Sequence, residues 1–414
     1  MQMRLPFTKI DIPLRTALGN TIMIVNVYVW YTYASAILRD VIDDMYFTYG
    51  EKLTFYTILF LSIVVSTLVG TSFASRLTNR KRFLLVWTFF GAFSSLSLAV
   101  LENATIINVV VALSLIGVSF GFGLPTCMAI FADITKEDNR AQFGSIILLL
   151  MFLGIFAFGF IMPADLSLSV LVLIIWRLLG LVGILSFGNF LESVETKRGP
   201  SIVSLLKDRL LLLYLIPWIV FSLINYLSWP ICNRIHGEGF IRFSVLVNGI
   251  IAGISALVAG FLADNIGRKR TLVGGFIIFG VGYAVLGIYP FDIYAWYLYT
   301  VIDGIAWGII SVIFWFTIWG DLAHGKSSEK YYAIGLLPYA LSGFLRITLG
   351  PFIASAVSEY AIFSFAAFFL FLAVIPLMYA PETLPEKLIR QKELRRYVEK
   401  AKKIREKYER QEEN

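Results

Sequence analysis

The chain contains 414 residues, 58% of them hydrophobic and only 15% charged, with a mean hydropathy of +0.77 and a net charge of +7. Because a soluble domain carries about 25% charged residues, this composition excludes a soluble globular protein and indicates a membrane protein. The apolar runs are continuous and long enough to span a bilayer as α-helices, a pattern that does not fit a β-barrel. We expect a multi-pass protein of the cell membrane.

Twelve apolar runs follow one another along the chain. We expect spanning helices at about 16–37, 52–74, 83–101, 105–132, 142–163, 167–190, 209–232, 240–263, 271–290, 293–320, 332–356 and 360–380. Residues 1–190 then form a first six-helix bundle, residues 191–208 a cytoplasmic linker, and residues 209–380 a second six-helix bundle. The predicted fold class is an all-α membrane protein of twelve helices in two bundles.

Positive charge sets the expected orientation, because Lys and Arg mark the cytoplasmic side of a membrane protein. With both termini in the cytoplasm, almost all of the 35 Lys and Arg residues fall in cytoplasmic segments. The outer loops then contain only Arg39, Lys52, Arg234 and Arg242. The positive net charge therefore reports topology and does not indicate a nucleic-acid partner.

The two halves carry matching landmarks at one offset. Three pairs lie 188 residues apart: Arg80 to Arg82 with Arg268 to Arg270, Asp133 with Asp321, and Pro163 with Pro351. Two halves repeated in parallel order predict a pseudo-two-fold axis along the membrane normal. Such a repeat also predicts a solute site near the midplane, between the halves.

The stretch from Gly260 to Arg270 reads GFLADNIGRKR, an apolar run closed by an aspartate, a glycine and three basic residues. Two six-helix halves with this loop between helices 8 and 9 resemble the major facilitator superfamily. Trp176-Arg177, Pro381-Glu382-Thr383 and the spacing from Asp133 to Arg140 resemble its sugar-porter and metabolite–proton symporter branches. The resemblance implies transport by alternating access, with helices 1, 4, 7 and 10 lining the cavity.

The chain departs from the family pattern in two places. In the first-half loop, Arg76 stands in place of the motif aspartate and Asn79 in place of the second glycine, although Asn tolerates the left-handed turn that glycine supplies. In helix 1, Val29 and Thr32 stand where the metabolite symporters carry two acids. Facilitated diffusion and export therefore remain alternatives to proton-coupled import.

Three helix faces are expected to line the cavity. They comprise Asn26, Trp30 and Tyr33 on helix 1, Asn225, Tyr226 and Trp229 on helix 7, and Asp303 and Trp307 on helix 10. Residues three and four apart share one side of a helix. Amide and aromatic groups suit a hydroxylated or ring-bearing solute, while the alternative role for each residue is packing between helices.

Asp303 and Arg346 are charged residues at predicted membrane depth, which indicates function by default. Each lies about ten residues, or roughly 15 Å, from the outer end of its helix. The two helices are adjacent and antiparallel, so the residues are expected to pair. Such a pair is either structural or couples transport to protons; alternatively the two residues face apart. Arg177 is expected to reach toward the outer surface.

The cytoplasmic loops are expected to form a gate. In this hypothesis Asp264 caps the cytoplasmic end of helix 8, Gly267 permits a tight turn, and Arg268 to Arg270 reach carboxylates such as Asp321 or nearby helix carbonyls. Asp133 and Arg140 belong to the same expected gate. The alternative is a positively charged loop that only sets topology.

Residues 381–414 differ from the rest of the chain, because charged residues there alternate with Leu394, Tyr397, Ala401, Ile404 and Tyr408 at spacings of three and four. This pattern predicts a cytoplasmic amphipathic helix, which lies on the membrane, packs under the bundle or pairs with another tail.

The sequence therefore predicts a secondary transporter for a small polar organic solute, a sugar or an organic acid, coupled to protons and working as a monomer in the lipid bilayer. No metal-ligand spacing, nucleotide loop or catalytic motif appears, so we expect neither a cofactor nor an enzymatic activity. A facilitative uniporter or a drug or metabolite exporter is the alternative, and a non-transporting solute sensor is the second.

Overall fold

The computed structural model describes residues 2–5, 8–45, 47–74, 79–103, 105–186, 199–324 and 326–385, and Leu394. The helices of the first half are α1 (Leu14–Asp44), α2 (Tyr49–Ala74), α3 (Arg80–Ser95) continued by the 3₁₀ segment η1 (Leu96–Asn103), α4 (Ile106–Ile134), α5 (Arg140–Gly159) and α6 (Leu166–Ser186). A two-stranded antiparallel hairpin, β1 (Gln2–Leu5) and β2 (Thr8–Pro13), precedes α1, and the apolar pattern had not indicated it.

The second half begins after the short helix α8 (Ile202–Leu205). Its elements are α9 (Arg209–Ile224), α10 (Ser228–Ile266), α11 (Arg268–Ile288), α12 (Ile293–Ser311), the π-helix η2 (Val312–Thr317), α13 (Ile318–Leu322), α14 (Glu329–Thr348), α15 (Gly350–Ala356), α16 (Glu359–Leu372) and α17 (Val374–Tyr379). The predicted tail beyond residue 385 lies outside the described residues, apart from Leu394.

The described helices account for twelve membrane crossings. Ten helices are long and apolar enough to span, and α14 with α15, bent by 53° at their junction, make an eleventh. One of the ten runs for 58 residues from Arg209 to Ile266, roughly 87 Å of helix and far more than one crossing needs. Gly237 interrupts it with a φ of 76°, so this stretch makes two crossings, close to the predicted 209–232 and 240–263.

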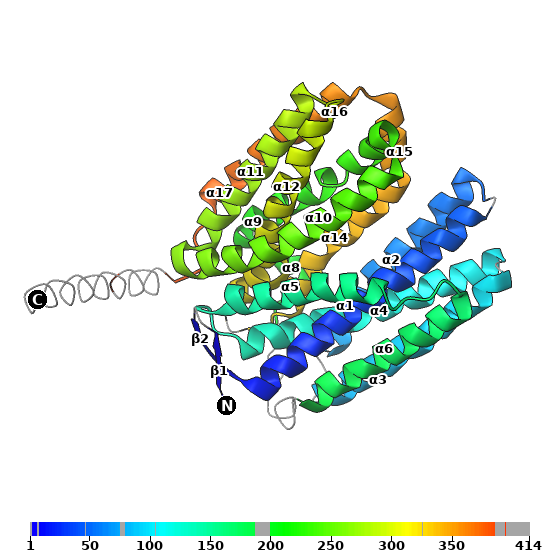
Figure 1. Cartoon of the computed structure of the whole chain (residues 1–414). Coiled ribbons are helices and arrows are strands. Elements are labelled where there is room, and N and C mark those ends of the chain that lie inside the picture. The colour runs from blue at the N-terminus through cyan, green and yellow to red at the C-terminus, as the bar shows by residue number, and fades with distance from the viewer. Residues whose placement is uncertain are drawn as a thin grey trace, which may run out of the picture.

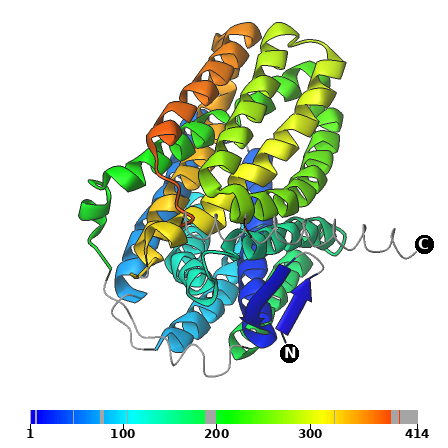
Figure 2. The same cartoon turned by 90° about the vertical axis from the view of Figure 1, so that its left-hand side faces the viewer.

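The crossings form two bundles, with α1–α6 in one and α9–α17 in the other (Figure 1). α5 packs on α10 and α2 packs on α14, which joins the bundles along two seams. The hairpin and residues 380–385, which follow α17, lie at the same end of the molecule, and Figure 2 views the bundles from that side. The twelve-helix, two-bundle architecture predicted from the repeat is therefore confirmed.

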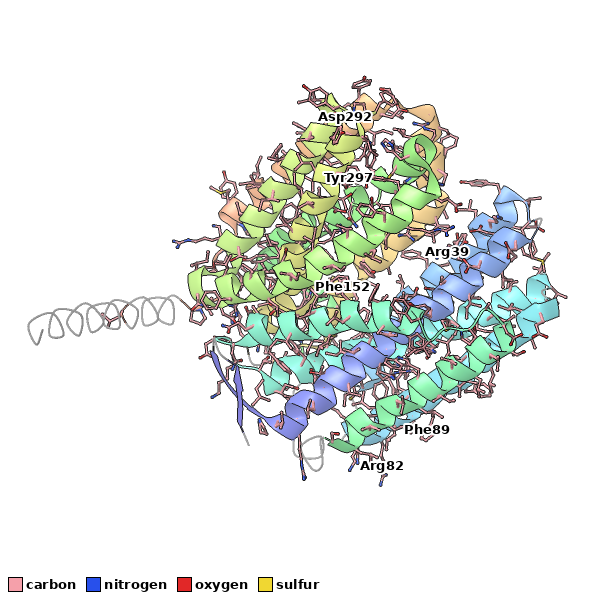
Figure 3. The ribbon with its side chains drawn as sticks, in the orientation of Figure 1. Arg39, Arg82, Phe89, Phe152, Asp292 and Tyr297 are labelled. Carbon is pink, nitrogen blue, oxygen red and sulfur yellow. The ribbon has the colours of Figure 1, made fainter. Side chains whose placement is uncertain are left out.

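Polar caps begin the helices, and apolar side chains cover their outer faces. Side chains of Asn79, Thr105, Asp208, Asp292 and Ser358 accept a hydrogen bond from a backbone N–H in the first turn of α3, α4, α9, α12 and α16. Phe89 on α3 points away from the bundle and is 54% exposed, while Arg82 lies at the end of the same helix (Figure 3). Exposed aromatic and aliphatic faces of this kind suit contact with lipid.

Candidate functional site

A cavity of about 320 Å³ lies between the two bundles. Its walls are α1, α2 and α4 of the first bundle, and α14 with Tyr226 of the second. Arg39, near the outer end of α1, lies between the bundles in Figure 3 and belongs to the lining. A cavity of this size accommodates a small organic molecule.

The face that α1 turns to the cavity differs from the expected one. Tyr28, Tyr31, Thr32 and Ser35 line the cavity. The expected residues pack inside the first bundle: Asn26 Nδ2 donates to the Trp176 carbonyl, Trp30 Nε1 donates to Ser95 Oγ at 2.8 Å, and Tyr33 Oη donates to the Ile155 carbonyl at 2.7 Å. Asn26, Trp30 and Tyr33 therefore join α1 to α6, α3 and α5, as the alternative of packing between helices predicts.

Arg177 explains the orientation of α1. Its side chain is only 1% exposed, and its guanidinium carbon lies 5.4 Å from the ring centroid of Trp30 and 4.4 Å from that of Trp87. Its Nη1 donates to Asn26 Oδ1 at 2.8 Å. The prediction that Arg177 reaches toward the outer surface is wrong, because cation–π contacts and the Asn26 amide hold its guanidinium group inside the bundle.

The residues expected on helices 7 and 10 divide between the cavity and the bundle interior. Tyr226 lines the cavity. Asn225 and Trp307 bind each other instead, with Trp307 Nε1 donating to Asn225 Oδ1 at 2.7 Å. Trp229 lines a second, smaller cavity together with Asp303, and its ring centroid lies 4.9 Å from the guanidinium carbon of Arg346.

Arg346 lines the cavity from α14. Its guanidinium carbon lies 4.9 Å from the ring centroids of both Tyr226 and Trp229. Cation–π contacts of this kind attract a guanidinium group to aromatic faces. They leave in-plane N–H groups available for other partners.

Asp303 occupies a different place, a smaller cavity of about 40 Å³ between α10 and α12. It is 8% exposed, and its Oδ2 accepts a hydrogen bond from Asn248 Nδ2 at 2.8 Å. Its Oδ1 has no hydrogen-bond partner among the described residues. The expected pairing with Arg346 is not formed in this structure, because each residue has other neighbours.

Aromatic rings from both bundles close the inner end of the large cavity. Tyr28 of α1 stacks on Trp315 of η2, with ring centroids 5.5 Å apart and an interplanar angle of 10°. Trp315 also meets Tyr339 of α14 edge-on, at 5.0 Å. These contacts form a floor between the cavity and the cytoplasmic ends of the helices.

Beyond this floor, Asp321 is the centre of a buried polar network. It forms ion pairs with Arg140 of the first bundle and, at 3.1 Å, with Arg268 of its own bundle. Thr383 donates a further hydrogen bond to Asp321 Oδ2 at 3.1 Å. Because Arg140 begins α5 and Asp321 lies on α13, this network joins the two bundles.

Asp264 makes a second connection between the bundles. Its carboxylate accepts hydrogen bonds from the backbone N–H groups of Ala141, at 3.2 Å, and Gln142, at 2.8 Å. It also lies 2.6 Å from Arg268 Nη1, and neither charged side chain is exposed. Asp264 was expected to cap the end of its own helix, but it caps the first turn of α5 across the interface, where the helix dipole favours an anion.

The turn after Asp264 depends on Gly267, whose φ of 112° lies in the region that favours glycine. Glu382 fills the space beside it and accepts hydrogen bonds from the backbone N–H groups of Arg268 and Lys269, at 2.7 and 3.1 Å. Asn79 does not repeat this turn, because it is extended, with a φ of −123°, and caps α3. Arg270, the last residue of the expected gate, is exposed.

A related network in the first-half loop involves Arg80. Its guanidinium lies 2.7 Å from Asp133 in its own bundle and 3.1 Å from Glu329 in the other. Arg76, the residue that departs from the family pattern, lies outside the described residues. Arg80 and Arg268 thus occupy corresponding positions 188 residues apart, and each pairs with the corresponding aspartate.

Sequence reasoning missed Glu329, Glu382 and the cavity tyrosines of α1. The repeat carries a signal for Glu329, because position 329 corresponds to position 141 at the offset of 188 residues. Since Ala141 contacts Asp264 across the bundle interface, its counterpart Glu329 is expected at the same interface. Glu382 belongs to a recognised motif, but nothing in the motif showed that it caps α11. The tyrosines were missed because the wrong face of helix 1 was chosen.

The chain was compared with protein-family models, curated proteins and solved structures. The family model described as Major Facilitator Superfamily matches residues 20–345. A search of curated proteins finds no match.

Three solved structures share the fold. The human organic anion transporter MFSD10 is 15% identical, with a TM-score of 0.61 over 88% of this chain and 98% of that one. The E. coli fucose:proton symporter is 11% identical, with a TM-score of 0.66 over 87% and 98%. A bacterial homologue of the iron transporter ferroportin, in an outward-facing state, is 11% identical, with a TM-score of 0.69 over 88% and 98%. At these identities the likeness concerns the fold alone.

Proposed function

Because the chain belongs to the major facilitator superfamily, we propose that it carries a small polar organic solute across the cell membrane by alternating access, using the cavity between its two bundles. The observation that carries the proposal is the contrast between the two ends of the bundle interface. A cavity whose lining includes Arg39 lies at the outer end, and a buried charge network joins the bundles at the cytoplasmic end. In this arrangement the solute enters from outside and leaves once the network has opened.

The network suits a reversible seal. Asp264, Arg268 and Asp321 are fully buried or nearly so, and Arg140 and Glu329 bring partners from opposite bundles. Buried ion pairs are favourable only while their partners remain together. A rocking motion that separates the bundles removes Arg140 from Asp321 and Arg80 from Glu329, so the sealed and open states are distinct.

Proton coupling is part of the proposal and is assigned to Asp303. A carboxylate at membrane depth with no cation beside it is costly, and such residues mark ion and proton pathways. Asp303 lies on α12, whose continuation η2 supplies Trp315 to the cavity floor. Proton binding in the small cavity therefore acts on the same helix that closes the solute cavity.

Alternating access can be tested without knowing the solute. Gly343 lines the cavity, and a Cβ added there meets open space, so Gly343→Cys is a suitable probe. The native Cys127 and Cys232 are buried, and variants lacking them serve as background controls. An impermeant maleimide is expected to label Gly343→Cys in right-side-out vesicles and, more slowly, in inside-out vesicles. Labelling from the outer side alone would contradict alternating access and favour a static binding protein.

Proton coupling needs a separate experiment. Purified protein in liposomes is offered labelled sugars and organic acids, with and without an inward proton gradient. We expect at least one solute to exchange across the membrane and to accumulate only with the gradient. Exchange without gradient-driven accumulation would instead support a facilitative uniporter.

A further inference from the structure

The cavity between the bundles has a one-sided charge. Two of its lining residues, Arg39 and Arg346, are cationic, and no Asp or Glu lines it among the described residues. Arg39 is 40% exposed in its side chain and lies 3.9 Å from Asp40, so water and a neighbouring acid moderate its charge. Arg346 lies deeper and carries the argument.

Arg346 has aromatic neighbours in place of an acid. Its two cation–π partners, Tyr226 and Trp229, hold the guanidinium plane. No carboxylate lies within ion-pair distance of it among the described residues. A guanidinium at membrane depth is costly unless it is paired or faces a water-filled cavity, so this position is ready for an anionic partner. The in-plane N–H groups match the two oxygens of a carboxylate.

The rest of the lining supplies a second, independent observation. Tyr28 and Tyr56 are only 5% and 6% exposed, and their hydroxyl groups have no hydrogen-bond partner among the described residues. Both line the same cavity as Arg346. A buried hydroxyl without a partner is costly, which indicates that a ligand or water supplies the missing hydrogen bonds.

The aromatic walls of the cavity indicate the chemical character of the uncharged part of that ligand. Tyr31 stacks on Phe120 with ring centroids 3.8 Å apart, and Phe60 stacks on Phe344 at 5.1 Å; all four line the cavity. Flat apolar walls of this kind bind ring or hydrocarbon surfaces. A single deep arginine suits one carboxylate better than a multiply charged phosphate, because the second cation is at the mouth.

We infer that the solute is a small organic monocarboxylate, bound through its acid group to Arg346 and through its apolar or aromatic body to the tyrosine-lined walls. This inference rests on the proposed transport function and narrows it to one chemical class. The inference assigns different roles to the two charged residues at membrane depth. Arg346 recognises the solute, and Asp303 serves coupling from its own cavity.

The test compares matched probes that differ only in charge. Benzoate, benzamide and benzylamine are titrated against purified full-length protein by calorimetry, together with lactate and lactamide. The wild-type protein is expected to bind each carboxylate about tenfold or more tightly than its amide, the size of one charge-assisted hydrogen bond. Equal binding, tighter binding of the amide or amine, or no binding of any probe would overturn the inference.

Variants locate the site. Arg346→Gln is expected to abolish the preference for carboxylates, and Arg346→Lys to restore part of it, since it keeps the charge but loses the planar fork. Arg242→Gln is the matched control, because Arg242 is exposed and its side chain pairs with Glu238 outside the cavity. A preference that survives in Arg346→Gln would place the anion elsewhere and contradict the assignment.

A protection experiment avoids dependence on how well these variants fold. In protein with native Arg346, benzoate is expected to slow outer labelling of Gly343→Cys, and benzamide is not. Equal effects of the two probes would contradict the inference. The outcome is separable from transport: two-sided labelling without carboxylate preference refutes only the substrate class, and carboxylate binding with outer labelling alone refutes only alternating access.

Discussion

The guanidinium of Arg80 in the first bundle lies 3.1 Å from the carboxylate of Glu329 in the second, and these side chains are 4% and 0% exposed. The pair connects the start of α3 with the start of α14, so it belongs to the same cytoplasmic seal as Asp264, Arg268 and Asp321. Because this seal depends on buried charges, removing single charges should change how often the cavity opens to the cytoplasm.

Glu329→Gln should weaken the seal, because it leaves Arg80 with Asp133 alone. Removing one charge of a buried ion pair is destabilising, so the population open to the cytoplasm should rise severalfold or more. The measurement is the rate at which Gly343→Cys is labelled in inside-out vesicles. Arg270→Gln, which removes an exposed charge on the same side, is the control and should leave this rate unchanged. Equal rates in both variants would remove Glu329 from the gate.

Asp264→Asn should loosen the other connection. The amide keeps the shape of the side chain but loses the charge that faces Arg268 and the first turn of α5. We expect faster labelling of Gly343→Cys from the cytoplasmic side and slower labelling from the outside. If the two rates stay at wild-type values, the loop serves topology alone.

Asp303→Asn should separate coupling from exchange. The variant keeps the hydrogen-bonding geometry with Asn248 but cannot bind and release a proton. Accumulation driven by a proton gradient should disappear, while counterflow exchange of the same solute in liposomes should continue. Asn248→Ala, which removes the neighbour but keeps the acid, should retain some accumulation. Undiminished accumulation in Asp303→Asn would end the coupling role of Asp303.

Arg177→Lys should destabilise the first bundle without changing solute selectivity. A lysine cannot lie flat between Trp30 and Trp87, and cation–π contacts of a desolvated cation contribute about 2 kcal/mol. Thermal unfolding in detergent should therefore begin several degrees lower than in the wild type. An unchanged unfolding temperature would show that the tryptophan contacts add little, and a changed carboxylate preference would place Arg177 in the solute site.

The sequence predicts the large-scale organisation well, because hydropathy, charge bias and the repeat each report on chain topology. Asp264 and Arg268 were also placed together correctly, since the family motif concentrates them in one loop, and Arg268 was correctly expected to reach Asp321 at the end of another span. The rotation of α1 could not be predicted. Both of its faces carry polar and aromatic residues, so helical spacing grouped Asn26 with Trp30 and Tyr33 without showing which way the group points.

Asp303 and Arg346 illustrate a second limit. Their depths match, yet depth along a helix does not determine direction around it. Aromatic partners from α10 and from the turn before it hold Arg346 at the cavity, and Asn248 holds Asp303 against α10. Both sets of partners are distant in sequence from the charged residue that they contact, so the hydropathy pattern could not predict these contacts.

The exchange of charges across the seal also bears on assembly. Arg140 belongs to the first bundle and its acid, Asp321, to the second, whereas Glu329 belongs to the second bundle and its base, Arg80, to the first. Each bundle produced alone would therefore lose a partner that the other supplies, although Asp133 and Arg268 still pair with Arg80 and Asp321 within a bundle. Two separately expressed fragments, residues 1–190 and 209–414, would recognise each other by these complementary ends, and a duplicate of either fragment would meet like charges instead.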